Sequence, residues 1–347
     1  MTNWPSESKQ AKRTKLLLFL ISPVLGFLHS LRSMNTKSSY WVFFFFAVCF
    51  GMAFSIDAYD SFSYNRSGID AGRYRLEFER SADMTSYDFV HSFNNYTQFD
   101  DGDKDFYYIS MVYVISRFTH NYHFLFLAFA MVFAFFQLKT LRFLTQNEYF
   151  ENTLFFLILV VFFTWNQIFN INAMRFYTAA WVSVYSIFQI FLNERKRYFV
   201  LLLLPPFFHS SFWLFDAILI VAYLFKRFDI IWIALLVFSF FSTTILADLI
   251  TTAADYLPDF LAKTASGYTI SDRLYSETNF TGTGFYWVPM VFDTLYKIYV
   301  NLLVVLLILN RKVLKEGREK FLYVIAIVIM AYVNFAMPIP ALGRRSI

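Results

Sequence analysis

Long apolar runs dominate this chain and limit what it can fold into. Several approach the ~20 residues that an α-helix needs to span a bilayer: 40–56, 123–141, 153–170, 174–192, 229–250, 287–309 and 321–337. Three others are shorter or interrupted: 16–30, 106–118 and 198–225. Only 16% of the 347 residues are charged, against about 25% in soluble domains. The sequence therefore predicts an all-α, polytopic integral membrane protein, a single domain over 1–347 with about 9–11 helices, some of them broken or re-entrant.

Basic residues orient these segments, because Lys and Arg collect in cytoplasmic loops. Basic clusters flank many of the apolar runs: Lys9/Lys12/Arg13/Lys15, Arg32/Lys37, Lys139/Arg142, Arg195/Lys196/Arg197, Lys226/Arg227 and the group between Arg311 and Lys320. All of them fall on one side of a membrane if 16–30 and 106–118 do not cross and if 198–225 enters and returns. The prediction is a cytoplasmic N-terminus, with the acidic regions 57–105 and 251–286 as extracytoplasmic loops. The net charge of +5 then reflects membrane orientation and does not indicate a nucleic-acid partner.

A lone arginine, Arg175, stands in the apolar stretch "FFTWNQIFNINAMRFYTAAW". A charge in a membrane is costly and faces an interior cavity or reaches the interface. A guanidinium stays protonated and binds phosphate through two hydrogen bonds, so Arg175 is a candidate anion-binding residue. The alternative is an arginine whose charged end reaches the interface from a helix terminus. Topology places Arg175 near the outer face.

A double proline interrupts the run 198–225 just before His209, in "PPFFHSSFW". Proline removes a helix hydrogen bond and clashes with the preceding turn, so a broken segment is expected here. His209 is a candidate proton acceptor or hydrogen-bond donor to a substrate; alternatively it caps the broken backbone together with the serines that follow. Asp216, seven residues later, would share a face with His209 on a continuous helix. It either assists the imidazole or is satisfied by a neighbouring helix.

Other polar groups have simpler interpretations. Asp293 and Lys297 have the i,i+4 spacing of an ion pair within one helix. The aspartates between Asp100 and Asp105 lack the glycine and the closing glutamate of a calcium loop. With one cysteine and no HExxH spacing among five histidines, the sequence predicts no metal site and no cofactor.

Two stretches resemble a known family. The acidic and aromatic segment "DKDFYYISMVYVISRFTHNYHFLF" precedes one apolar run, and "NINAMRFYTAAWVSVYSIFQIFLNERKRYFVLLLLPPFFHSSFWL" contains an arginine, a basic turn and a His-x-Ser. Over roughly 105–215 the chain is similar to the EpsG/Wzy-type polysaccharide polymerases. Arg175 matches the family arginine, and His209 with Ser211 matches the family histidine and serine. Phe176 stands where the family pattern has glutamine.

The resemblance extends weakly to the C-terminal "GRRSI". Family members carry a late external arginine, which Arg344 or Arg345 would match. The resemblance implies Arg175 and His209 as catalytic residues. Arg344, Arg345, Asp216, Ser211 and Asn172 are candidates for substrate binding.

The resemblance also implies a function. Such enzymes transfer a growing glycan from undecaprenyl pyrophosphate to a hydroxyl of an incoming lipid-linked repeat, at the outer face of the bacterial inner membrane. The products are O-antigen, capsule or exopolysaccharide, and related structures look like the GT-C membrane fold. The implied partners are undecaprenyl-pyrophosphate-linked oligosaccharide, membrane lipid and, as a candidate, a chain-length regulator protein. Because arginines can neutralise the leaving pyrophosphate, the reaction is expected to be metal-independent.

Two other functions stay open at this point. A flippase or transporter of lipid-linked oligosaccharide would need charges along a path through the membrane midplane and usually an internal repeat. The unpaired polar groups of this chain gather toward one face, which favours the polymerase. A membrane acyltransferase with His209 as the base ranks last, because no HxxxD pattern surrounds that histidine.

Overall fold

The structure is a computed structural model that describes residues 4–56, 70–81, 83–98, 106–146, 168–225, 227–240, 252, 287–313 and 318–336. The described residues form helices joined by turns, with no strand among them, as the sequence predicts. They divide into two compact units. The first holds Met1–Gln98 and Gly102–Trp213, and the second holds Phe99–Asp101 and Leu214–Ile347.

Among the described helices, Tyr122–Thr145 is the one stretch whose length and apolar composition are sufficient for a membrane crossing. Shorter apolar helices cover Lys37–Ala53, Phe106–Ser116, Phe212–Leu224, Asp229–Ser239, Ile298–Leu309 and Lys320–Phe335. The apolar run 153–170 lies almost wholly outside the described residues. The number and direction of membrane crossings therefore stay predictions.

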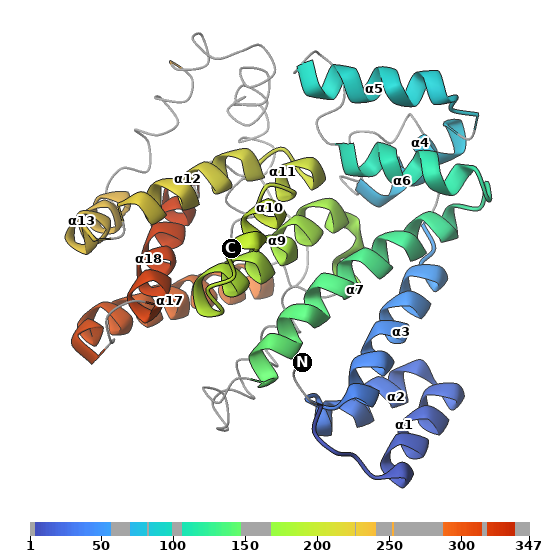
Figure 1. Ribbon diagram of the computed structural model, residues 1–347, viewed down its shortest axis with the longest axis horizontal. Helices are drawn as coiled ribbons and strands as arrows, with labels where there is room; N and C mark the ends of the chain where they lie inside the picture. The colour runs from blue at the N-terminus through green and yellow to red at the C-terminus, as the bar shows by residue number, and fades with distance from the viewer. Residues whose placement is uncertain are drawn as a thin grey trace. The chain divides into compact units, whose positions relative to one another are not determined.

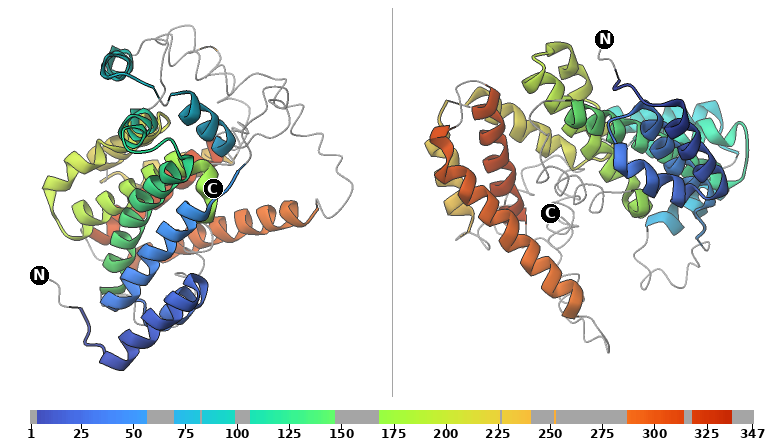
Figure 2. Two further views of the ribbon diagram at one scale, coloured as in Figure 1. Left: turned by 90° about the vertical axis from the view of Figure 1, so that its right-hand side faces the viewer. Right: turned by 90° about the horizontal axis from the view of Figure 1, so that it is seen from below.

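The first unit begins with a helical hairpin. Helix α1 (Lys9–Ile21) is capped by Ser8, whose hydroxyl accepts a hydrogen bond from the backbone N–H of Ala11 at 3.1 Å. Ser22 is extended, and Pro23 then opens α2 (Pro23–Ser30), a position where proline's missing N–H is harmless. A Cβ on Gly26 would lie 2.7 Å from the Cα of Phe19, so glycine permits the close approach of the two helices. The apolar run 16–30 is thus two short helices that pack side by side (Figure 2).

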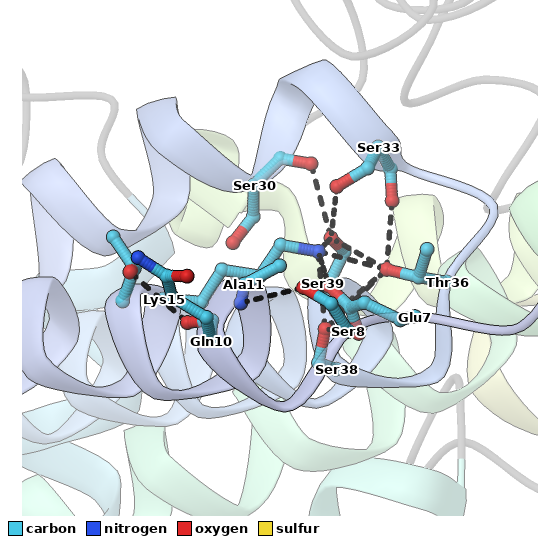
Figure 3. A network of polar contacts seen from close by, with 11 residues as sticks. Glu7, Ser8, Gln10, Ala11, Lys15, Ser30, Ser33, Thr36, Ser38 and Ser39 are labelled. Carbon is cyan, nitrogen blue, oxygen red and sulfur yellow. Dashed lines mark hydrogen bonds and ion pairs between the residues drawn. The ribbon is translucent and has the colours of Figure 1, made fainter.

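A buried lysine ties this hairpin to α3 (Lys37–Ala53), which follows the short helix η1 (Leu31–Ser33). The Nζ of Lys15 donates to Oε1 of Glu7 at 2.5 Å and to three hydroxyls. These belong to Thr36 at 2.9 Å, Ser38 at 3.0 Å and Ser39 at 2.8 Å (Figure 3). The side chains of Lys15 and Glu7 are only 3% and 7% exposed, so the charge pair is withdrawn from solvent.

This network predicts an acid-sensitive hairpin. Burial opposes ionisation of Glu7, but hydrogen bonds from Lys15 and Ser38 outweigh it and lower the pKa below its ordinary value of 4.5. A lowered folded-state pKa contributes stability that is present above pH 4.5 and is lost as pH falls through the folded pKa. We expect the protection of the α1 amides from hydrogen exchange, measured relative to the intrinsic exchange rate at each pH, to decrease over that range. Glu7→Gln should abolish this pH dependence, and an unchanged dependence would contradict the assignment to Glu7.

Helices α3, α7 (Tyr122–Gln146) and α9 (Met174–Ile187) form the core of the first unit, with α3 alongside α7 (Figure 1). Leu125, Phe126, Phe129 and Phe133 recur at helical spacing on one face of α7, and all are fully buried. A Cβ on Gly51 would lie 2.7 Å from the carbonyl oxygen of Phe126, so glycine again allows close helix packing.

The region 57–105, expected as a polar loop, contains two helices. Helix α4 (Asp70–Arg80) buries Ala71, Tyr74 and Phe78 completely, at a spacing of three and four residues. Helix α5 (Ser86–Gln98) begins with a capping box. The backbone N–H of Thr85 donates to Asp88 at 2.8 Å, and the N–H of Asp88 donates to the Thr85 hydroxyl at 3.2 Å. Helix α6 (Phe106–Ser116) follows and packs against both α5 and α7.

The chain after α9 is irregular, as the prolines predict. A π-helix, η5 (Phe188–Leu192), and a short 3₁₀-helix, η6 (Lys196–Tyr198), lead into α10 (Phe199–Leu202). The helix breaks again before α11 (Pro205–Phe208), where the prolines occupy the first turn. His209 follows in an extended conformation with φ −156° and ψ 125°. The predicted break is confirmed, and its depth in a membrane stays a prediction.

The second unit contains most of α12 (Phe212–Leu224), followed by α13 (Asp229–Ser239), α17 (Trp287–Leu309), η7 (Arg311–Val313) and α18 (Arg318–Ala336). Helix α13 packs along α18, and α17 meets α18 (Figure 2). Buried polar groups are paired across this contact, since the amide of Asn334 donates to the Ser239 hydroxyl at 3.1 Å.

Candidate active site

Arg175 is the second residue of α9, directly after the 3₁₀-helix η4 (Ile168–Ala173). The first N–H groups of an α-helix lack partners within the helix and give its N-terminus a partial positive charge. The N-cap residue, Ala173, provides no side-chain cap. The guanidinium therefore adds to the positive end of the helix dipole, and the two together favour an anion at this position.

Two tyrosines from other helices hold the guanidinium of Arg175. Its Nε donates to the hydroxyl of Tyr74 on α4 at 2.6 Å, and its Cζ lies 4.8 Å from the Tyr74 ring centroid. The ring of Tyr108 on α6 lies 6.0 Å from the same carbon. The Tyr108 hydroxyl donates to the backbone carbonyl of Tyr74 at 3.1 Å. Arg175 is half-buried, so these contacts fix a cation that partly retains access to its surroundings.

His209 is 8% exposed and is oriented by Ser211. Its Nδ1 lies 2.8 Å from the Ser211 hydroxyl and accepts the backbone N–H of Ser211 at 3.3 Å. Because a backbone N–H can only donate, this contact requires a lone pair on Nδ1. The neutral imidazole then carries its proton on Nε2.

Phe176 connects Arg175 to His209. Its ring packs edge-on against the imidazole with centroids 5.4 Å apart, and against Phe212 at 5.3 Å. Phe176 follows Arg175 directly in α9, so His209 lies beside the same end of that helix. The resemblance places a glutamine at this position. In this chain the side chain at that position makes an aromatic contact with the imidazole.

Helices α5 and α6 hold the segment that precedes His209. The hydroxyl of Tyr96 on α5 donates to the carbonyl of Pro206 at 3.3 Å, and its ring lies 5.5 Å from that of Phe207. On α6, the ring of Tyr107 lies 4.4 Å from that of Phe208. The aromatic residues of the predicted acidic loop and of the following segment thus support the irregular backbone at the site.

Among the remaining candidates, only Asp216 has a side chain that the structure describes. Asp216 lies in the second unit, buried in α12, and both its carboxylate oxygens lack a hydrogen-bond partner in the described part of the chain. Asn172 lies in η4, before α9, but its side chain is outside the description, as are those of Asp293 and Lys297. Arg344 and Arg345 lie outside the described residues, together with the aspartates between Asp100 and Asp105.

Tyr74 and Tyr108 are the site residues that sequence reasoning missed. The sequence predicts region 57–105 as an acidic extracytoplasmic loop and assigns no role to either tyrosine. The spacing of Ala71, Tyr74 and Phe78 carries the helical signal that predicts a buried face. For Tyr108, the sequence shows the aromatic start of α6, but nothing in it links this residue to Arg175.

The arrangement in the first unit holds a permanent positive charge, Arg175, at the start of α9 and a buried imidazole, His209, beside the same end of that helix. Charged donors fixed before a reaction begins are the groups that stabilise charge developing on a leaving group.

Comparison with known proteins gives one finding. A family model described as the EpsG family matches residues 40–347, which is most of the chain. Neither the curated proteins nor the solved structures include a match to this sequence.

Proposed function

This chain belongs to the EpsG family, and from that premise we propose that it polymerises lipid-linked oligosaccharide repeats with Arg175 at the reacting pyrophosphate. Family membership supports a polysaccharide-polymerase role for a membrane protein in general terms. The observation that carries the specific proposal is the guanidinium of Arg175, held by Tyr74 at the start of α9. We place the reaction at the outer face of the bacterial inner membrane, on a GT-C-like fold, with undecaprenyl pyrophosphate as the leaving group.

The proposed reaction is a glycosyl transfer. A hydroxyl oxygen of the incoming lipid-linked repeat bonds to the anomeric carbon of the growing glycan. The bond from that carbon to the pyrophosphate breaks, and its electron pair leaves with the pyrophosphate. Negative charge grows on the pyrophosphate as the sugar acquires oxocarbenium character. Arg175 stabilises this charge through hydrogen bonds that need no proton transfer.

For His209 the contacts with Ser211 favour a donor role. With Nδ1 accepting from the Ser211 backbone, Nε2–H points a donor away from that serine and can bond a pyrophosphate oxygen. The proton of the attacking hydroxyl then passes to an oxygen of the departing pyrophosphate. This refines the sequence-based expectation, which left proton acceptance and hydrogen bonding to substrate both open.

Reconstitution tests the function directly. Purified protein in proteoliposomes, supplied with undecaprenyl-pyrophosphate-linked repeats, should convert them into longer lipid-linked chains. EDTA should leave the rate unchanged, because the proposal uses arginine instead of a metal. Movement of repeats across the bilayer without chain growth would reject the polymerase and support the flippase alternative. Acylated repeats would support the acyltransferase.

The donor role of His209 predicts unequal effects of two substitutions. The amide nitrogen of glutamine reaches the position of Nε2, whereas that of asparagine reaches Nδ1. We expect His209→Gln to retain much of the polymerisation rate and His209→Asn to lose it. Equal loss in both variants, with normal protein levels, would favour proton acceptance by the imidazole instead.

Tyr74→Phe should slow polymerisation without abolishing it. The change removes the hydroxyl that accepts from Arg175 and leaves the ring beneath the guanidinium. Hydrogen bonds to charged groups contribute about 1.5–3 kcal/mol, so a decrease of roughly ten- to a hundredfold is expected if the bond persists in the transition state. Tyr113→Phe is the matched control, because Tyr113 lies under another arginine, Arg117, at 4.6 Å. Equal rates in the two variants would remove Tyr74 from the site.

A further inference from the structure

The outward face of α1 changes its chemistry along the helix axis. Its first exposed residues are Lys9, Gln10, Lys12 and Arg13, three of them basic. The next exposed residues on the same helix are Leu16, Leu17, Leu20 and Ile21, whose exposed fractions rise from 57% to 75%. These positions recur at intervals of three and four, so one continuous face is cationic at its N-terminal end and apolar at its C-terminal end.

Helix α2 continues this arrangement in the opposite order. Val24, Leu25 and Leu28 are about half exposed, and the chain then reaches exposed Arg32 and Lys37. The apolar side chains therefore gather at the turn between α1 and α2, around Ile21 and Val24. The basic side chains gather at the open end of the hairpin.

The direction of this division is informative. A helix that lies in the plane of a membrane interface has its polar and apolar faces on opposite sides of the axis. Here the division follows the axis, which suits a helix whose C-terminal end points into the hydrocarbon region. At 1.5 Å per residue, the 13 residues of α1 measure about 20 Å, less than the ~30 Å hydrocarbon core.

The hairpin is held as one piece on α3. The ring of Phe27 on α2 stacks on Phe46 with centroids 4.5 Å apart and meets Phe43 edge-on at 5.3 Å. At the other end, the Lys15 network joins α1 to the start of α3 (Figure 3). The buried lysine lies on α1 between Arg13 and Leu16, where the exposed face changes from basic to apolar.

We propose that the α1–α2 hairpin enters the cytoplasmic leaflet end-on and stops within it, with Lys9, Lys12 and Arg13 bound to anionic lipid headgroups. Basic segments beside a membrane are attracted to anionic lipid, and they lie on the cytoplasmic side. The return of the chain to Arg32 and Lys37 brings both ends of the hairpin to the same headgroup region. The family model begins at residue 40, so the hairpin precedes the matched region and this inference does not depend on the proposed function.

Cysteine accessibility tests the depth of the hairpin. In a Cys49→Ser background, which removes the exposed cysteine of the described residues, Gln10→Cys and Leu25→Cys place thiols at the base and near the tip. We expect Gln10→Cys to react with a membrane-impermeant maleimide from the cytoplasmic side only. Leu25→Cys should react from neither side, and a fluorophore attached there should be quenched by lipids with nitroxide groups on their acyl chains.

Reaction of Leu25→Cys from the outer side would show a full crossing, and reaction from the cytoplasmic side as fast as Gln10→Cys would show a hairpin outside the bilayer. Either result overturns the proposal.

Lipid composition tests whether the basic residues of α1 bind anionic headgroups. In nanodiscs, acyl-chain quenching of the fluorophore at Leu25→Cys should be stronger with phosphatidylglycerol than with phosphatidylcholine alone. The added substitutions Lys9→Gln, Lys12→Gln and Arg13→Gln should remove that difference. As a control, neutralising Arg195, Lys196 and Arg197 removes the same amount of charge from another exposed segment. This control should preserve the difference between the two lipids. Absence of a phosphatidylglycerol effect in the original sequence, or its loss in the control, would overturn headgroup binding.

Discussion

Arg175→Lys should reduce chain growth nearly as much as Arg175→Ala, although lysine retains the positive charge. The guanidinium is planar, and its fork of donors matches two phosphate oxygens, whereas an ammonium is a point charge on a flexible stem. Lysine also has no Nε–H to donate to the Tyr74 hydroxyl, which accepts that bond at 2.6 Å. Loss of one fixed donor to developing charge lowers kcat on the order of 100- to 1,000-fold.

The matched control for this substitution is Arg117→Lys. Arg117 also stacks on a tyrosine, Tyr113, but it is exposed at the end of α6. If arginine–tyrosine stacking mattered only for stability, the two substitutions would have similar effects. We expect Arg117→Lys to leave the lengths of the lipid-linked products unchanged.

The outcome must also be separated from a failure to fold. Membrane-inserted protein of each variant is quantified, and its thermal stability in detergent is compared with that of the original sequence. The proposal expects Arg175→Lys to be present and folded but slow in single-turnover assays with saturating lipid-linked repeat. Product chains of normal length and rate from Arg175→Ala would remove Arg175 from the mechanism.

Sequence reasoning predicted the helical class and singled out two residues of the candidate site, Arg175 and His209, because each inference rests on local signals. Apolar runs of sufficient length predict helices, and the double proline predicts the break before His209. An arginine in an apolar stretch is conspicuous because its burial is costly. Each of these inferences uses neighbours within a few residues, which the sequence presents directly.

The contacts that orient the site join residues far apart in the chain. Tyr74 and Arg175 are 101 residues apart, and Tyr96 bonds a carbonyl 110 residues away. Local pattern marks α4 as a helix with a buried face, but it does not identify the helix against which that face packs. The same limit applies to Lys15, which counted as one of four basic residues in an N-terminal cluster. Its burial depends on Thr36, Ser38 and Ser39, which the turn before α3 brings to it.

That burial makes Lys15→Met the substitution with the largest expected effect on the stability of the hairpin. Removing the ammonium leaves the Glu7 carboxylate, 7% exposed, without its ion-pair partner. It also removes the ammonium from which the hydroxyls of Thr36 and Ser39 both accept a hydrogen bond. Breaking a buried ion pair by removing one partner costs about 3–5 kcal/mol. The exposed Lys12→Met on the same helix is the control and should have little effect.

A double substitution tests whether Lys15→Met destabilises the hairpin through the unpaired charge of Glu7 or through the lost contacts between the ammonium and the hydroxyls. Replacing both members of a buried ion pair by uncharged groups is often close to neutral, because the desolvation penalty is removed together with the attraction. Lys15→Met combined with Glu7→Gln should therefore recover much of the stability that Lys15→Met alone loses. Amide exchange of residues 9–30 measures this locally, since opening of the hairpin exposes those amides without unfolding of the whole chain. If the double variant exchanges as fast as Lys15→Met alone, the hairpin is stabilised by the hydroxyl contacts of the ammonium, and the Glu7–Lys15 pair contributes little.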